Sequence, residues 1–206
     1  MSHANAVENF VAHEGPSAES RPAAMSRLAL TILVLCVLVP WPSRAGDLDL
    51  MSVGVRARVG EKRVLGTEAP ESFREYDVVA SIRLPWEGDS ASGWGVGTRL
   101  LASAGVLQGA DKTALVVSLI PVIAFGSHDR RFTVDFGAGL ALISERRYAQ
   151  QDFGGPLQGA LTFGVGVPLY RRVGVGYRFL HYSDAGAYGP DSIGVDFHMV
   201  EFIYRF

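Results

Sequence analysis

Large apolar and small side chains alternate with a period of two through much of this chain. From 157 to 167, Leu, Phe and Val with a single Gly occupy one parity, and Gly, Ala, Thr and Gln occupy the other. Successive side chains of a β-strand point to opposite faces, so this period predicts strands and not helices. Residues 114–125 are apolar at both parities, which leaves their facing open. Similar alternation, less regular in the first half, recurs at 51–59, 76–86, 94–100, 132–142, 173–179 and 200–206.

Two architectures can use such strands. In a soluble sandwich or lipocalin-like barrel the second parity would face water, but here it is mostly Gly, Ala, Ser and Thr with isolated charges. Small residues suit the crowded bore of a narrow barrel, and an outward apolar band is typical of outer-membrane barrels. About eight strands of about ten residues match the length of a tilted membrane-crossing strand. We therefore expect an all-β fold, an eight-stranded antiparallel outer-membrane β-barrel spanning 46–206. Inside it, basic residues are expected to pair with acidic ones: Arg56, Arg58, Arg83, Arg99, Arg178 and Arg205 with Asp77, Asp135 and Glu201.

The segment 25–45 has the layout of a secretory signal peptide. Arg27 supplies the positive start, 28–39 the apolar core, and Ser-Arg-Ala at 43–45 a cleavage site. Pro40 ends the apolar run well short of the roughly 20 residues that a spanning helix needs. Residues 1–24 lack an apolar period, and we expect them to be an upstream extension, disordered or a misplaced start, outside the fold.

Composition narrows the function classes. A net charge of -2 excludes a basic nucleic-acid binder, and a hydrophobic content of 48% argues against a disordered chain. The single cysteine, Cys36, lies within the expected signal peptide. The mature chain is therefore expected to have no disulfide, thiolate nucleophile or cysteine metal site.

The lengths of the connections orient the barrel. In such barrels both termini lie in the periplasm and the longer connections face outside. Polar connections at 60–72, 144–155 and 183–192 are long, whereas 126–130 and 168–172 are short; only 85–93 is longer than this rule favours. Residues near 183 and near 195 are thus expected at the outer-leaflet surface.

His181 and Ser183 are two residues apart on one strand, so they share a face with Cα atoms about 6.5 Å apart. Their parity is that of Tyr177, which points outward to lipid, and Asp196 has the outward parity of the neighbouring strand. Serine, imidazole and carboxylate are the parts of a nucleophilic acyl-transfer site. The pattern alone leaves open a second interpretation, in which these are ordinary residues of the membrane interface.

The C-terminal motifs favour the first interpretation. The runs His181-Tyr182-Ser183-Asp184-Ala185-Gly186 and Gly194-Val195-Asp196, with a final strand ending Tyr204-Arg205-Phe206, resemble the lipid A 3-O-deacylase family of outer-membrane esterases. Its signature is approximately His-x-Ser-Asn-Ala, a short loop, then Gly-Ile-Glu. Glycine-alternating runs at 136–140 and 163–166 extend a weaker likeness upstream. The family is known as an eight-stranded barrel whose Ser-His-Glu triad faces the membrane.

The resemblance implies roles for particular residues. Ser183 would be the nucleophile, His181 the general base and then acid, and Asp196 would replace the family's glutamate. The substrate would be lipopolysaccharide, deacylated at position 3 of lipid A in the outer leaflet of the cell outer membrane, with no metal or organic cofactor. The family's asparagine is Asp184 here, and a carboxylate donates no hydrogen bond unless protonated. Backbone N–H groups near Ala185 and Gly186, beside Asp184, are therefore the expected oxyanion donors.

Further residues carry alternatives. Arg146 and Arg147 could contact lipid A phosphates, or they are solvated loop charges. Asp191 is a second candidate acid, and His198, one step deeper than Asp196, is interpreted as an interface residue. Two competing functions are a non-catalytic barrel that anchors or adheres and keeps a vestigial site, and an outer-membrane phospholipid esterase. The sequence indicates no protein partner.

Overall fold

A computed structural model describes residues 49–60, 63–65, 72–89, 94–127, 132–189 and 194–206. The expected signal peptide and upstream extension lie outside these residues and stay predictions. No helix among the described residues is long and apolar enough to cross a membrane. The described strands are β1 (Leu50–Gly60), β2 (Arg74–Asp89), β3 (Trp94–Gly109), β4 (Lys112–Ser127), β5 (Thr133–Ile143), β6 (Arg147–Tyr148), β7 (Gln151–Asp152), β8 (Leu157–Tyr170), β9 (Val173–Ser183) and β10 (Val195–Arg205).

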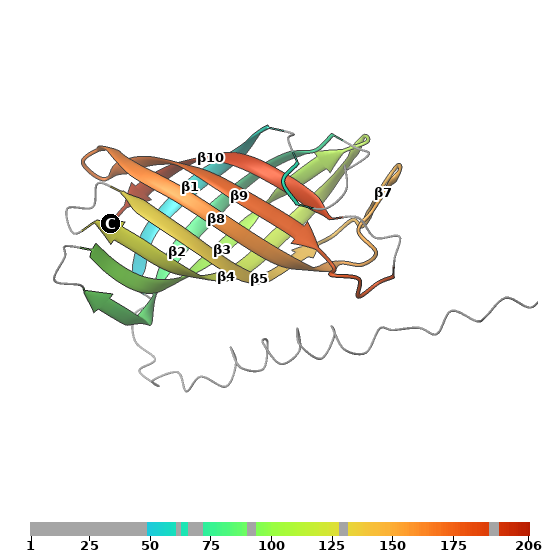
Figure 1. Ribbon diagram of the computed structural model, residues 1–206. Coiled ribbons are helices and arrows are strands. Elements are labelled where there is room, and N and C mark those ends of the chain that lie inside the picture. The colour runs from blue at the N-terminus through green and yellow to red at the C-terminus, as the bar shows by residue number, and fades with distance from the viewer. Residues whose placement is uncertain (1–48, 61–62, 66–71, 90–93, 128–131, 190–193) are drawn as a thin grey trace, which may run out of the picture. The chain divides into compact units, whose positions relative to one another are not determined.

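Eight of these described strands form a closed barrel in the order β1-β10-β9-β8-β5-β4-β3-β2 (Figure 1). Every pairing in it is antiparallel, and β1 closes the sheet against β10, for example at Val55 opposite Phe202. Closure leaves no unpaired strand edge, which a hydrocarbon environment requires. The predicted eight-stranded antiparallel barrel is confirmed. Strands β2, β3 and β4 have 16 residues each, so they are longer than the crossing length of about ten residues.

The two ends of the barrel differ. The terminal end carries Asp49, Phe206 and the turn between β8 and β9; the loop end carries the connections β1–β2, β5–β8 and β9–β10. The β6–β7 hairpin projects from the loop end, away from the C-terminus (Figure 1). The sequence predicts only a polar loop there, because two paired residues per strand are too few to show alternation.

Outward and inward faces follow the predicted parities. Valine, leucine and phenylalanine side chains cover the outer wall of the barrel and are exposed. In β4, whose facing the sequence left open, Leu115 and Leu119 point outward, whereas Ser118 and Ile120 point into the bore. The hydroxyl of Ser118 is hydrogen-bonded to that of Ser103 on β3 at 2.7 Å. The inward-facing serine of β4 therefore has a polar partner inside the bore.

Buried ion pairs between nearby strands lie inside the bore. Arg56 Nε lies 2.6 Å from Asp77 Oδ1, and Arg178 lies 2.7 Å from Asp135 and 3.2 Å from Glu201. These side chains are almost fully buried, and each charge has a partner, as low-dielectric burial demands. The structure thus contains the network expected for these two arginines and three acids.

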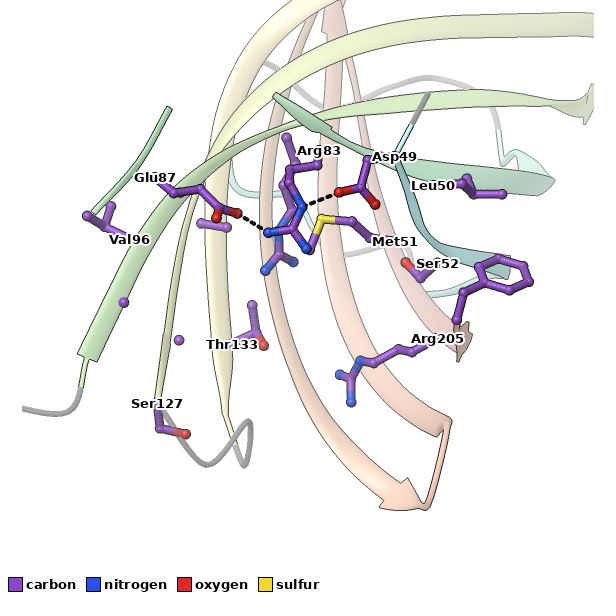
Figure 2. A pocket seen from close by; sticks show the side chains of 16 residues that line it. Asp49, Leu50, Met51, Ser52, Arg83, Glu87, Val96, Ser127, Thr133 and Arg205 are labelled. Carbon is purple, nitrogen blue, oxygen red and sulfur yellow. Dashed lines mark hydrogen bonds and ion pairs between the residues drawn. The ribbon is translucent and has the colours of Figure 1, made fainter. Parts of the chain in front are cut away.

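The other expected interior arginines are arranged differently. Arg83 pairs with Asp49 and Glu87 at the terminal end, where these side chains are 39–59% exposed (Figure 2). A cavity of about 540 Å³ opens there, lined also by Arg99 and Arg205. The prediction that Arg83 pairs with the interior acids is wrong, because its strand has reached the open mouth and local carboxylates meet it first. Arg58, near the loop end, donates to the backbone carbonyls of Gly60 and Phe73.

Large side chains fill the half of the bore nearer the loop end. The expectation of a small, polar interior therefore holds only toward the terminal end. The interior of an eight-stranded barrel is just wide enough for side chains to fill it. Apolar side chains can pack closely there without charged partners. Loop residues contribute to this filling, and the rings of Phe73 and Tyr148 meet edge-on with centroids 5.1 Å apart. The largest fully buried members are Phe73, Leu107, Ile120, Ile143, Tyr148, Phe153, Leu180, Tyr182, Phe197 and Met199.

Candidate active site

His181 and Asp196 face each other directly across the β9–β10 ladder at the loop end. Both point outward, because the alternate residues Leu180, Tyr182 and Phe197 are buried in the bore. The imidazole Nδ1 lies 2.6 Å from Asp196 Oδ1. A carboxylate only accepts hydrogen bonds, so Nδ1 carries the proton and Nε2 is left as the basic nitrogen. This is the tautomer that a general-base histidine needs.

The other carboxylate oxygen of Asp196 is held by the connection between β1 and β2. The backbone amides of Val64 and Leu65 each donate a hydrogen bond to Oδ2, both at 2.7 Å. Asp196 is only 5% exposed and His181 only 9%, although both point away from the bore. The amides of Val64 and Leu65 thus orient the acid. Three hydrogen bonds to one carboxylate stabilise its ionised form.

Ser183 ends β9 on the same outward face, one step beyond His181. A side-chain carbon placed on Gly194 would lie 3.0 Å from both His181 Cε1 and Ser183 Cβ. The imidazole edge and the serine therefore approach the same point from two sides. Among the described residues, the Ser183 hydroxyl accepts a hydrogen bond from the amide of Ala185 at 3.4 Å, and none joins it to His181. Such contacts are often loose before substrate binds.

Asp184 organises the turn after Ser183. Its two carboxylate oxygens accept hydrogen bonds from the amides of Gly186, at 3.0 Å, and Tyr188, at 2.7 Å. The Gly186 amide, expected as an oxyanion donor, is thus directed at Asp184. The Ala185 amide is directed at the serine oxygen instead. Ala185 and Gly186 have φ of 51° and 80°, in the left-handed region that tight turns use.

Arg146 directly precedes the β6–β7 hairpin, Arg147 is the first residue of it, and both are exposed. The guanidinium of Arg147 pairs with Asp152 at 2.6 Å across the hairpin. The amide of Gly154 and this guanidinium hold the pKa of Asp152 below its ordinary value. Arg147 is therefore engaged within its own hairpin.

The outward row of β10 continues below Asp196. His198 Nδ1 lies 2.5 Å from the hydroxyl of Tyr177, so this histidine is engaged away from the dyad. Val200 and Phe202 follow on the same face and line an apolar groove of about 640 Å³ on the outer wall. Asp191, the second candidate acid, lies outside the described residues.

Sequence reasoning missed the amides of Val64 and Leu65, because a backbone donor leaves no mark on residue type. Gly194 belongs to the C-terminal motif, but only the fold shows why a glycine is needed there: a side chain would press against His181 and Ser183. Within the described part of the chain, no cluster of three or more His, Cys, Asp or Glu side chains is placed to hold a metal ion.

Comparisons with known proteins identify a family and a similar fold. The family model described as "Lipid A 3-O-deacylase (PagL)" matches residues 74–205. The crystal structure of the outer membrane enzyme PagL is similar with a TM-score of 0.62 and 19% identity, covering 75% of this chain and 99% of that one. This likeness shows the fold alone. The outer membrane protein Ail of Yersinia pestis reaches a TM-score of 0.43 at 11% identity, covering 76% of this chain and 99% of that one. No curated protein matches the chain.

Proposed function

The chain belongs to the lipid A 3-O-deacylase family and is an outer-membrane β-barrel; from this premise we propose that it is a serine esterase that hydrolyses the ester-linked acyl chain at position 3 of lipid A. The observation that carries the proposal is the 2.6 Å contact between His181 and Asp196 beside Ser183. All three side chains share the outward face of neighbouring strands.

The reaction has two halves. Nε2 of His181 takes the hydroxyl proton of Ser183 while Oγ bonds to the ester carbonyl carbon. When the bond from that carbon to the sugar oxygen breaks, His181 returns the proton to the departing hydroxyl. Water then attacks the acyl-serine with the same proton relay and releases the fatty acid. Asp196 stays ionised throughout and stabilises the imidazolium.

The negative charge that develops on the carbonyl oxygen needs hydrogen-bond donors. The amide of Ala185 is the favoured donor, because it already points at the serine oxygen. Asp184 and Gly186 act indirectly, by holding the turn that presents this amide. The mechanism requires no metal or organic cofactor. Losing a single oxyanion donor lowers rates by about 10²–10³ in serine hydrolases.

An outward-facing site at the loop end suits a lipid substrate. We place it at the outer leaflet, where the ester meets water while the acyl chains stay in hydrocarbon. The apolar groove that includes Val200 and Phe202, and is otherwise lined by β1, β2 and β3, lies on the outer wall beside the strand that carries Asp196, so it offers a path for an acyl chain. Arg146, and Arg147 if it leaves Asp152, would meet the lipid A phosphates above.

Mass spectrometry of lipid A from a Gram-negative host, with and without the full chain, tests the proposal. We expect loss of one 3-linked hydroxyacyl chain, abolished by Ser183→Ala and by His181→Ala. Ser52→Ala, at the terminal end, is the matched serine control and should behave like wild type. Unchanged lipid A with correctly inserted protein would support a vestigial site instead. Fatty acid released from glycerophospholipid alone would support a phospholipid esterase.

A further inference from the structure

Tyr188 lies across two glycines of a different loop. A side-chain carbon on Gly155 would lie only 2.2 Å from Tyr188 Cζ, and one on Gly154 only 2.5 Å from Tyr188 Cβ. Both distances are far below a van der Waals contact, so this backbone accepts the ring only because it carries no side chains. Tyr188 thus packs the β9–β10 connection onto the β5–β8 connection.

Each side of this contact is held by its own hydrogen bonds. The Tyr188 amide donates to Asp184, which directly follows Ser183, at 2.7 Å. On the other side, the buried amide group of Gln158 donates to the carbonyls of Phe153, at 2.9 Å, and Gly155, at 2.7 Å. A continuous set of contacts therefore runs from the barrel wall at Gln158 to the residue beside the serine.

The turn needs such an external contact. It contains residues with left-handed φ at Ala185, Gly186 and Gly189. The amides of Gly186, Ala187 and Tyr188 all donate to Asp184, so these hydrogen bonds fold the turn onto itself, whereas the Tyr188 ring ties it to a different loop. A pivot there would displace the Ser183 hydroxyl from His181, and a displacement of about 1 Å can cost about 100-fold in rate.

We propose that Tyr188 is a positioning residue, a latch whose ring holds the turn that follows Ser183 (184–189) against Gly154–Gly155. This inference rests on the proposed function, in which Ser183 is the nucleophile. The ring acts by packing, because no hydrogen bond of its hydroxyl occurs among the described residues. Phenylalanine should therefore replace it, and alanine should not.

Gly155 allows a test from the opposite side. Its φ is not in the left-handed region, and the three atoms nearest to an added side-chain carbon all belong to the Tyr188 ring, so Gly155→Ala should act by pushing that ring away. We expect Tyr188→Ala and Gly155→Ala each to lower kcat on lipid A about 10-fold or more, with KM unchanged. The double variant should be no worse than Tyr188→Ala alone, because the methyl group then has no ring to displace. Tyr188→Phe should retain wild-type kcat.

Gly166→Ala is the matched control, since a side-chain carbon there meets nothing closer than 3.9 Å. Its kcat should equal that of wild type. Far-UV circular dichroism of each variant, with its thermal midpoint, separates latch loss from misfolding. Loss of kcat with an unchanged midpoint, rescued by phenylalanine, is the expected signature.

A spin label on Ala187→Cys, in the full chain with Cys36→Ser, reports turn mobility independently of activity. We expect increased mobility in Tyr188→Ala and in Gly155→Ala, and none in Tyr188→Phe. If wild type fails to deacylate lipid A but the label still responds in this way, the proposed function fails and the latch stands. If Tyr188→Ala leaves kcat unchanged, or leaves the label's mobility unchanged, the positioning role is overturned.

Discussion

Asp196 accepts a hydrogen bond from the backbone amide of Leu65, which lies 131 positions earlier in the chain, at 2.7 Å. The amide of Val64 donates to the same oxygen. Asp196 on β10, the last strand, is therefore oriented by the connection that follows β1, the first strand, against which β10 closes the barrel. Asp196 is one methylene shorter than the family's glutamate, and the β1–β2 connection binds it through two backbone amides.

Asp196→Asn should abolish most activity without unfolding the barrel. The remaining carboxamide oxygen would turn toward the amides of Val64 and Leu65, and the NH₂ group would face His181. That arrangement forces the proton onto Nε2, the nitrogen that must accept the serine proton. In a serine protease the equivalent change costs about 10⁴ in kcat. Steady-state kinetics on micellar lipopolysaccharide measures it, and a loss under tenfold would contradict the assigned tautomer.

Gly194→Ala should lower kcat by about 10–100-fold. The added carbon would lie 3.0 Å from His181 Cε1, Ser183 Cβ and the Tyr182 carbonyl, so it must push one of them away. Gly88→Ala, whose nearest contact would be 3.6 Å, is the control at the terminal end. Equal kcat values for the two variants would show that Gly194 is not packed against the reacting side chains.

Two roles are possible for Asp184, and they predict opposite changes of kcat for Asp184→Asn. If the family's asparagine donates to the oxyanion, Asp184→Asn should preserve or raise kcat. If Asp184 caps the turn, asparagine loses one of the two acceptors that hold Gly186 and Tyr188, and kcat should fall several-fold. We expect the fall, with a larger one for Asp184→Ala, measured on the same substrate.

The interior ion pairs predict a contrast in stability. Asp77→Asn leaves Arg56 charged and buried without its partner, which typically costs about 3–5 kcal/mol. Asp49→Asn breaks the exposed pair with Arg83, worth about 0–1 kcal/mol. Guanidinium unfolding in detergent micelles, followed by far-UV circular dichroism, measures both free energies. Similar losses for the two variants would contradict the difference in burial.

Local sequence was sufficient for the barrel and for part of the site. Alternation with period two depends only on neighbouring residues, so it predicts strands and their faces wherever the two parities differ. It also predicts that His181, Ser183 and Asp196 face outward. Because consecutive strands pair in a hairpin, it further predicts that these side chains lie close together. The parity test failed in β4, where Leu115 and Val116 are both apolar and only pairing decides.

The remainder depends on contacts between distant segments. The amides that orient Asp196 come from the β1–β2 connection, and the glycines beneath Tyr188 come from the β5–β8 connection. Neither relation has a periodic or compositional signal in one sequence. The large apolar side chains in the bore escaped prediction for a related reason, since Phe73 and Tyr148 enter it from the connections between barrel strands.

Reaction with an alkyl fluorophosphonate tests the central claim most directly, because the reagent modifies only a serine activated by a base. Peptide mapping of the full chain in detergent should locate one adduct, on Ser183. The rate of modification should fall to background in His181→Ala and strongly in Asp196→Asn. No adduct, an adduct on another serine, or modification of Ser183 at the same rate without His181 would contradict an outward-facing serine esterase.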